Sequence, residues 1–253
     1  RYVKAASSGA DLICIDLEDS VPADQKDAAR QSVLTALASL DREKTAVRIN
    51  GLNTADGLAD LLALRNADHS PSLVLIPMVE NASEMQIAHN ILGDKVDGLI
   101  PLIETVKGLR SGDSIAASKG VTAMMFGGGD FSAELGTKLE WEPLLAARGA
   151  FIMCCASAQI MAIDVPYIDM SNEDGLAEEC TRAKAMGFHA KAAIHPKQIA
   201  AIQTAMRPSE ADITEAREAI AAYDQAGGKA ISHNGRMLEA PVMERYRRII
   251  KSA

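Results

Sequence analysis

The sequence predicts an α/β protein built as a (β/α)₈ TIM barrel, followed by a C-terminal helical extension. Seven short apolar runs lie about 25 to 30 residues apart, with a helical pattern between them, which is the spacing of repeated β-α units. A length of 253 residues suits one barrel-sized domain. A doubly wound sheet would have a glycine fingerprint after its first strand, whereas the turn here is acidic, DLEDS.

The order of the predicted elements suggests that the barrel's first strand is missing from the supplied sequence. Residues 1–9, RYVKAASSG, are typical of the second half of a helix that ends at a glycine. The seven predicted strands then follow at 12–17, 45–49, 73–78, 96–103, 121–126, 161–167 and 190–196. The helices between them are expected at 24–38, 55–65, 82–92, 111–117, 142–158 and 175–186.

The pattern changes beyond Pro208, so we expect the barrel to occupy residues 1–207 and the helical extension residues 208–253. Ser209 is a suitable N-cap for a helix that runs to about Asp224. After a break at two glycines, Asn234-Gly235 marks a turn and Pro241 opens a final helix. We interpret this extension as a lid over the barrel or an arm for oligomer formation.

Composition excludes several classes of partner. The net charge of -8 and the sequence pI of about 5.2 argue against nucleic acid or an anionic membrane surface as the main partner. An anionic substrate must therefore be held by local basic groups. The most apolar segment, residues 151–163, is too short and too interrupted by Ser157 and Gln159 to span a bilayer.

The cysteine pattern favours a reduced, cytoplasmic location. Four cysteines show no C-x-x-C spacing, and two of them are adjacent: Cys14, Cys154, Cys155 and Cys180. Because the sequence opens on Arg1 without a methionine, a mitochondrial targeting segment remains an alternative.

Two carboxylates stand where two successive apolar runs stop. Glu104 follows the run at 96–103, and Asp130 follows the run at 121–126 and three glycines. The carboxyl ends of parallel strands meet at one end of a barrel, so the two acids can converge on a hard cation such as Mg²⁺. Gly127, Gly128 and Gly129 would let a ligand approach the backbone there. The alternative is that Glu104 caps the following helix and Asp130 starts a turn.

Six ordered motifs resemble those of one protein family across nearly the whole chain: IDLEDSVP, VRING, IPLIET, FGGGD, AIDVPYIDMSNEDGL and KAAIHPKQI. The family is that of the citrate lyase β-subunit-like proteins, which are acyl-CoA lyases of the HpcH/HpaI aldolase superfamily. The resemblance implies a Mg²⁺-dependent barrel, usually a homotrimer or hexamer. Such proteins cleave or form a carbon-carbon bond between an acyl-CoA enolate and a 2-oxo acid.

The resemblance makes Glu104 and Asp130 the Mg²⁺ ligands and Arg48 the clamp for the substrate carboxylate. A planar guanidinium at a strand end suits this task, although a salt bridge at the barrel mouth is the alternative for Arg48. Three acids after the first run are expected to hold waters bound to the metal or to orient Arg48: Asp16, Glu18 and Asp19.

Asp19 has two further interpretations. It could also act only as an acid at a helix N-terminus. The aldolase branch that acts on free aldehydes has a histidine after the glutamate, where this chain has Asp19, so the CoA-lyase branch is favoured.

A second edge of the mouth is expected at the ends of the last two strands. The resemblance suggests that Asp164 and Pro166 line the channel for CoA. His195 is either a pocket residue or a hydrogen-bonded histidine at the barrel end.

The chain departs from the family pattern at three positions. The lyases usually have aspartate where this chain has Asn234 and Glu239, and the second of these aspartates is thought to be the general acid that acts from a neighbouring subunit. Glu239 keeps the carboxyl group on an arm that is one methylene longer. Met78 stands where the family often has lysine, which should alter the acidic groups that the site accepts.

The leading hypothesis is a Mg²⁺-dependent lyase that cleaves a 3-hydroxyacyl-CoA such as malyl-CoA or citramalyl-CoA to acetyl-CoA and a 2-oxo acid. A thioester hydrolase with the same barrel is one alternative. The other is a protein that binds acyl-CoA or a 2-oxo acid, or a citrate lyase β subunit that acts only with a partner. All three need Arg48, Glu104 and Asp130.

Overall fold

The computed structural model describes residues 2–251, which form two compact units. The first unit extends to Ile202 and the second begins at Gln203. The division falls inside helix α10 (Ile199–Met206), slightly before the boundary at Pro208 that composition suggests. Each unit has its own buried core and is described separately.

Seven parallel strands form the centre of the first unit, and their order in the sheet is their order in the chain. This curled α/β arrangement is the one that repeated β-α units produce. The outermost strands are β1 and β7, so an eighth strand stays a prediction. The strands are β1 (Ile13–Asp16), β2 (Thr45–Arg48), β3 (Leu73–Ile76), β4 (Gly98–Ile103), β5 (Ala123–Phe126), β6 (Met161–Asp164) and β7 (Ala190–Lys191).

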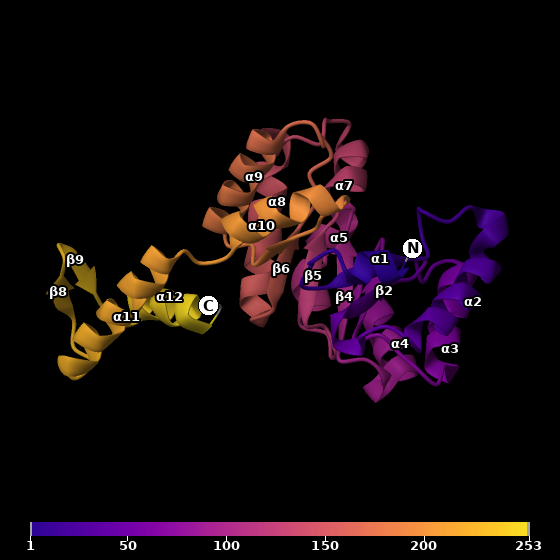
Figure 1. Cartoon of the computed structure of the whole chain (residues 1–253), viewed down its shortest axis with the longest axis horizontal. Helices are drawn as coiled ribbons and strands as arrows, with labels where there is room; N and C mark the ends of the chain where they lie inside the picture. The colour runs from indigo at the N-terminus through magenta and orange to yellow at the C-terminus, as the bar shows by residue number, and fades with distance from the viewer. Residues whose placement is uncertain (1, 252–253) are drawn as a thin grey trace. The chain divides into compact units, whose positions relative to one another are not determined.

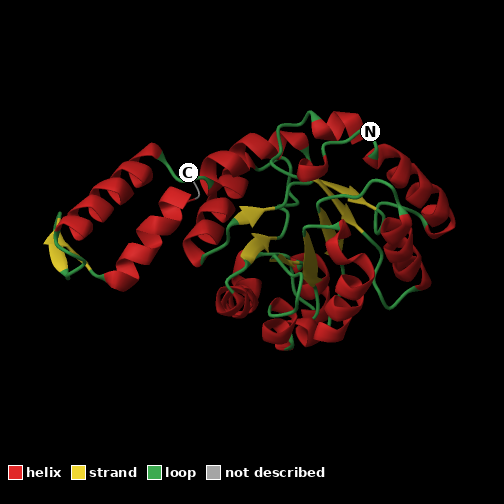
Figure 2. Cartoon of the chain, turned by 90° about the horizontal axis from the view of Figure 1, so that it is seen from below, coloured by secondary structure: helices red, strands yellow, loops and turns green. Residues whose placement is uncertain are grey.

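Helices follow the strands and surround the sheet, as Figures 1 and 2 show. The predicted helices are present within a few residues of their expected bounds. The helices described before α10 are α1 (Tyr2–Ala6), α2 (Lys26–Leu37), α3 (Ala55–Asn66), α4 (Ala82–Leu92), α5 (Val106–Arg110), α6 (Gly112–Ala116), α7 (Gly128–Leu135), α8 (Trp141–Ala158) and α9 (Glu173–Met186). Short 3₁₀ turns lie at Ala23–Gln25, Arg42–Lys44, Gly93–Lys95 and Pro196–Gln198.

Helices α5 and α7 were not anticipated. The Thr105 hydroxyl accepts a hydrogen bond from the backbone N–H of Gly108 at 3.0 Å, which starts α5 before the predicted helix. Helix α7 begins in the glycine triplet, and the low helix propensity of glycine is the reason that the sequence did not predict a helix there. Gly136, at a φ of 67°, ends α7 in a left-handed turn.

The sheet is buried on both faces at its centre. Every residue of β4 is buried, as expected for a central strand of a parallel sheet covered by helices. One apolar cluster joins side chains from four neighbouring strands: Ala46, Leu75, Ile100, Leu102 and Ala123. This packing fixes the strands whose carboxyl ends carry the candidate site.

The second unit is a helical hairpin closed by a small antiparallel ribbon. It contains α11 (Glu210–Gln225), β8 (Ile231–His233), β9 (Arg236–Leu238) and α12 (Ala240–Lys251). As predicted, Ser209 caps α11, with its hydroxyl 3.1 Å from the backbone N of Asp212. Asn234 and Gly235 have φ of 49° and 76°, as a tight hairpin turn requires. The core of the second unit is formed by Ala216, Ala219, Tyr223, Leu238, Met243 and Tyr246.

Across residues 2–251, no helix has the length and apolar character needed to cross a membrane.

Candidate active site

The carboxyl ends of β1 and β2 are joined by an ion pair. Asp16 and Arg48 are register partners at the last positions of the two strands. Arg48 donates from Nε to Asp16 Oδ1 at 2.7 Å and from Nη2 to Oδ2 at 2.8 Å. Burial alone would raise the pKa of Asp16, but the hydrogen bonds and charge of Arg48 outweigh it and hold the pKa below its ordinary value. Asp16 therefore occupies one side of the guanidinium fork.

Two further acids converge on the same guanidinium, as the sequence predicts. Arg48 Nη1 lies 2.7 Å from Glu18 Oε2, outside hydrogen-bond geometry, and 3.4 Å from Asp19 Oδ2. Burial raises the pKa of Glu18 to about 8, and the negative charges of Asp19, Glu104 and Asp16 add to the effect against the charge of Arg48. The carboxyl group of Glu18 therefore holds a proton to a higher pH than an ordinary glutamate does.

Glu104 stands directly after β4 and is 5% exposed. Its Oε2 accepts a hydrogen bond from the backbone N–H of Met78 at 2.7 Å. Thr105, not Glu104, caps the helix that follows, so the capping alternative for Glu104 is wrong. Burial raises the pKa of Glu104 to about 7, and the charge of Asp130 adds to this effect.

The glycine at the end of β5 makes room for Glu104. A Cβ atom on Gly127 would lie 2.1 Å from Glu104 Cγ and 2.6 Å from Oε1. A Cβ on Gly129 would meet nothing within 4 Å, so this position stays open for a ligand. Asp130 is exposed in the first turn of α7, where the helix dipole favours a negative charge.

The residues present fit a hard cation. Glu104 is buried and accepts one backbone hydrogen bond at Oε2. Ile103 and Phe126 are register partners, so Glu104 and Asp130 both follow the carboxyl ends of adjacent strands. Mg²⁺ is commonly held by one or two carboxylates, with substrate and water oxygens completing its coordination. No group of three or more metal-ligating side chains occurs among residues 2–251, so the candidate site depends on the pair.

The backbone N–H of Met78, which donates to Glu104, belongs to a residue with an unusual backbone conformation. Its φ of 54° lies in the left-handed region, which is uncommon for residues other than glycine. This conformation accompanies the contact between its N–H and Glu104. The Met78 side chain is partly exposed at the end of β3, where the sequence predicts an influence on substrate choice.

Asp164 is completely buried in a charged network. Its Oδ1 lies 3.1 Å from Arg148 Nε and its Oδ2 lies 2.6 Å from Lys191 Nζ. Lys191 also contacts Glu179 Oε1 at 2.7 Å and the carbonyl of Val165 at 2.7 Å. In this structure the carboxylate of Asp164 joins β6, β7 and α8, and it faces no open channel.

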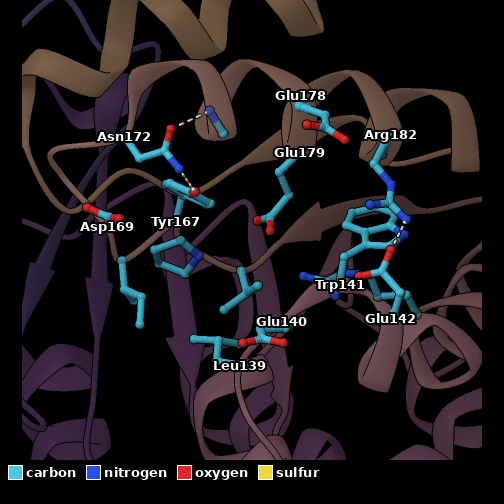
Figure 3. A pocket seen from close by; sticks show the side chains of 15 residues that line it. Leu139, Glu140, Trp141, Glu142, Tyr167, Asp169, Asn172, Glu178, Glu179 and Arg182 are labelled. Carbon is cyan, nitrogen blue, oxygen red and sulfur yellow. Dashed lines mark hydrogen bonds and ion pairs between the residues drawn. The ribbon is translucent and has the colours of Figure 1, made fainter.

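Pro166 lines a cavity of about 490 Å³ that contains neither Glu104 nor Asp130 (Figure 3). The Trp141 ring in its wall has Arg148 and Arg182 guanidinium carbons 4.5 and 4.6 Å from its centroid. The cavity is rich in acids: Glu140, Glu142, Asp169, Glu178 and Glu179.

His195 is a hydrogen-bonded residue beyond the end of β7. It caps the 3₁₀ turn at Pro196–Gln198, with its Nδ1 accepting from the backbone N–H of Lys197 at 3.2 Å. Of its two predicted roles, this geometry matches the structural one.

Glu239 lies in the second unit, exposed between β9 and α12. Its carbonyl accepts the backbone N–H of Met243 at 3.0 Å at the start of α12. The proposed proton-donor role of its carboxyl group stays a prediction.

Sequence reasoning missed a group of buried polar residues behind Arg48. Asp60, on α3, is 1% exposed and contacts both Asn50 and Arg30. The available signal was a carboxylate on the otherwise apolar face of α3 that includes Leu61 and Leu64. A buried acid at such a position requires partners.

Comparisons with known proteins find two matching family models. The model of the family described as HpcH/HpaI aldolase/citrate lyase matches residues 2–196. A second model, described as C-C bond lyase of the TIM-barrel fold, matches residues 147–253.

Individual relatives cover almost the whole chain. The mitochondrial citramalyl-CoA lyase of Rattus norvegicus is 31% identical over 99% of this chain and 81% of its own length. The L-malyl-CoA/β-methylmalyl-CoA lyase of Cereibacter sphaeroides is 31% identical over 100% of this chain and 90% of its own length. The crystal structure of CitE from Mycobacterium tuberculosis with magnesium, acetoacetate and coenzyme A has a TM-score of 0.84 and 31% identity, and the match covers 100% of this chain and 93% of that one.

The close approach of Gly127 to Glu104 yields a test of the metal site. We expect Gly127→Ala to weaken Mg²⁺ binding by about 10-fold or more, because the added Cβ must displace the Glu104 side chain. Gly149→Ala, in α8, is the matched control, since its Cβ would meet nothing within 4 Å. Calorimetric Mg²⁺ titration measures both; equal affinity in the two variants would contradict this placement of Glu104.

The raised pKa values of Glu104 and Glu18 predict an unusual pH dependence. Both groups bind protons more readily in the folded chain than in the unfolded chain, where the pKa is near 4.5. In the metal-free protein, these two groups contribute most to the free energy of unfolding below about pH 4.5. Their contribution is lost as the pH rises from there through 7 to 8. The contribution of Glu104 is about 3 kcal/mol.

Thermal unfolding in EDTA between pH 5 and 8 checks this dependence. Glu104→Gln should reduce it and leave the part due to Glu18. Mg²⁺ should protect the wild-type protein increasingly as the pH rises, because the cation binds the deprotonated carboxylate. A slope that is unchanged in Glu104→Gln would contradict the assignment.

Proposed function

The chain belongs to the HpcH/HpaI aldolase/citrate lyase family of carbon-carbon lyases, and within that family we propose that it is a Mg²⁺-dependent lyase acting on a 3-hydroxyacyl-CoA. The substrate is of the malyl-CoA or citramalyl-CoA type, and the products are acetyl-CoA and a 2-oxo acid. The relatives named for these two activities match nearly the whole chain, which supports this class of substrate.

The observation that carries the proposal is that Arg48, Glu104 and Asp130 lie at the carboxyl ends of three strands of one parallel sheet, β2, β4 and β5, with only β3 between β2 and β4. Glu104 follows β4, Asp130 follows β5, and Arg48 ends β2. A cation site beside a guanidinium suits a 2-oxo acid, which offers a carboxylate and a neighbouring oxygen. A bound Mg²⁺ would supply Lewis-acid stabilisation of the negative charge that develops during cleavage.

The chain's own residues then have separate tasks. Asp16 holds Nε and Nη2 of Arg48, so the substrate carboxylate binds at Nη1, where it replaces the contacts with Glu18 and Asp19. The substrate hydroxyl loses its proton to a solvent water, and its oxygen becomes the carbonyl of the 2-oxo acid as the carbon-carbon bond breaks. The electron pair of that bond remains on the acyl-CoA fragment as an enolate. Glu239 of a neighbouring copy, in a trimer or hexamer, protonates the enolate carbon and releases acetyl-CoA.

Cleavage of malyl-CoA and citramalyl-CoA by the purified chain tests the proposal. We expect acetyl-CoA and glyoxylate or pyruvate in equal amounts, with the reaction lost in EDTA and reduced at least about 100-fold in Glu104→Gln. Free CoA without acetyl-CoA would instead indicate a thioesterase. Binding of a 2-oxo acid without turnover would indicate a subunit that acts only with a partner, and either result contradicts the lyase.

The general-acid role of Glu239 has its own test. Glu239→Gln should lower the cleavage rate by about 100-fold, while Mg²⁺ affinity stays unchanged. Glu239→Asp should restore most of the activity, and Glu244→Gln is the matched control on exposed α12. If Glu239→Gln cleaves at the wild-type rate, another group donates the proton.

A further inference from the structure

A buried carboxylate on α3 is bonded to the loop that follows Arg48. Asp60 Oδ2 accepts two hydrogen bonds from Asn50, from the backbone N at 2.9 Å and from Nδ2 at 2.6 Å. Asp60 is 1% exposed and Asn50 is 6% exposed, so water does not compete strongly for these bonds. Asn50 is two residues from Arg48, so this contact fixes the backbone that directly follows the arginine.

The same asparagine connects this loop to the acidic loop that faces Arg48. Asn50 Nδ2 also donates to the carbonyl of Leu17 at 3.0 Å. Leu17 lies between Asp16 and Glu18, which both contact Arg48. Lys26 Nζ holds the same loop through the carbonyls of Leu17 at 2.8 Å and Glu18 at 2.7 Å. Asn50 therefore links the two segments whose side chains form the ion pair.

Asp60 is itself fixed from the opposite side. Its Oδ1 lies 2.5 Å from Nε of Arg30, which is 7% exposed on α2 and also contacts Asp27 and Asp56. Helix α3 approaches the loop so closely that a Cβ on Gly57 would lie 2.5 Å from the carbonyl of Asn50. Both oxygens of Asp60 thus have firm partners, and the loop cannot shift without breaking them.

We propose that Asp60 is a positioning residue for substrate binding, which acts through Asn50 to hold Arg48 and the acidic loop at a fixed separation. With Asn50 held, Nη1 of Arg48 stays at a constant position while Asp16 holds Nε and Nη2. This inference rests on the proposed role of Arg48 as the clamp for the substrate carboxylate.

Asp60→Asn is the direct test, because an amide cannot satisfy both partners. If the new NH₂ group points toward Asn50, it meets the two N–H donors of that residue. If it points toward Arg30, it meets the Nε–H donor there. We expect the Kd for pyruvate at saturating Mg²⁺ to rise about 10-fold, with the Kd for Mg²⁺ alone unchanged. Isothermal titration calorimetry of the full chain measures both constants.

Asp56→Asn is the matched control. Asp56 is on the same helix and contacts Arg30 at 3.1 Å, but it makes no contact with Asn50. Pyruvate affinity should change less than about 2-fold in this variant. If Asp60→Asn fails to fold, Asn50→Ala removes the same link from the loop side and should weaken pyruvate binding in the same way.

A double-mutant cycle separates positioning from general stability. In an Arg48→Lys background, Asp60→Asn should add almost no further loss of pyruvate affinity, because the group that it positions is gone. An unchanged pyruvate Kd in Asp60→Asn, or equal losses in both backgrounds, would overturn the inference alone. An unchanged Kd in Arg48→Lys itself would overturn the substrate role of Arg48, and this inference with it.

Discussion

The ion pair between Arg48 and Asp16 determines the geometry of the candidate site. The two residues end neighbouring strands in register, so the pairing of the strands itself brings their side chains together. Two hydrogen bonds from Nε and Nη2 to Asp16 fix the plane of the guanidinium. Glu18 and Asp19 then add negative charge around the same group, which keeps it firmly cationic.

At Glu104 burial outweighs the favourable contacts, so its pKa is raised, whereas that of Asp16 is lowered. Glu104 is buried among apolar strand residues, and its one strong donor in the described structure is the N–H of Met78. Its desolvation favours the neutral acid, and a bound cation would reverse this preference by supplying the missing positive charge. The backbone of Met78 and the absent side chain of Gly127 both serve the placement of this one carboxylate.

Not every acid at a strand end is a ligand. Asp164 ends β6 much as Asp16 ends β1, yet it is neutralised by Arg148 and Lys191 inside the protein. Removing either base would leave a buried charge without a partner, so this network maintains the packing of β6 and β7. Asp164 is paired with two basic side chains of the protein, whereas Glu104 accepts its hydrogen bond from the backbone N–H of Met78.

The sequence by itself determined the alternation of strands and helices, the second helical unit, and the acids and arginine of the site, because hydrophobic periodicity and polar residues at run ends are local signals. It indicated neither α7, since glycines disfavour helices, nor the burial of Asp164. Only the tertiary structure decided which charges meet. Asp60 lies ten residues from Asn50 in the chain and thirty from Arg30, and such contacts depend on how helices pack on the sheet.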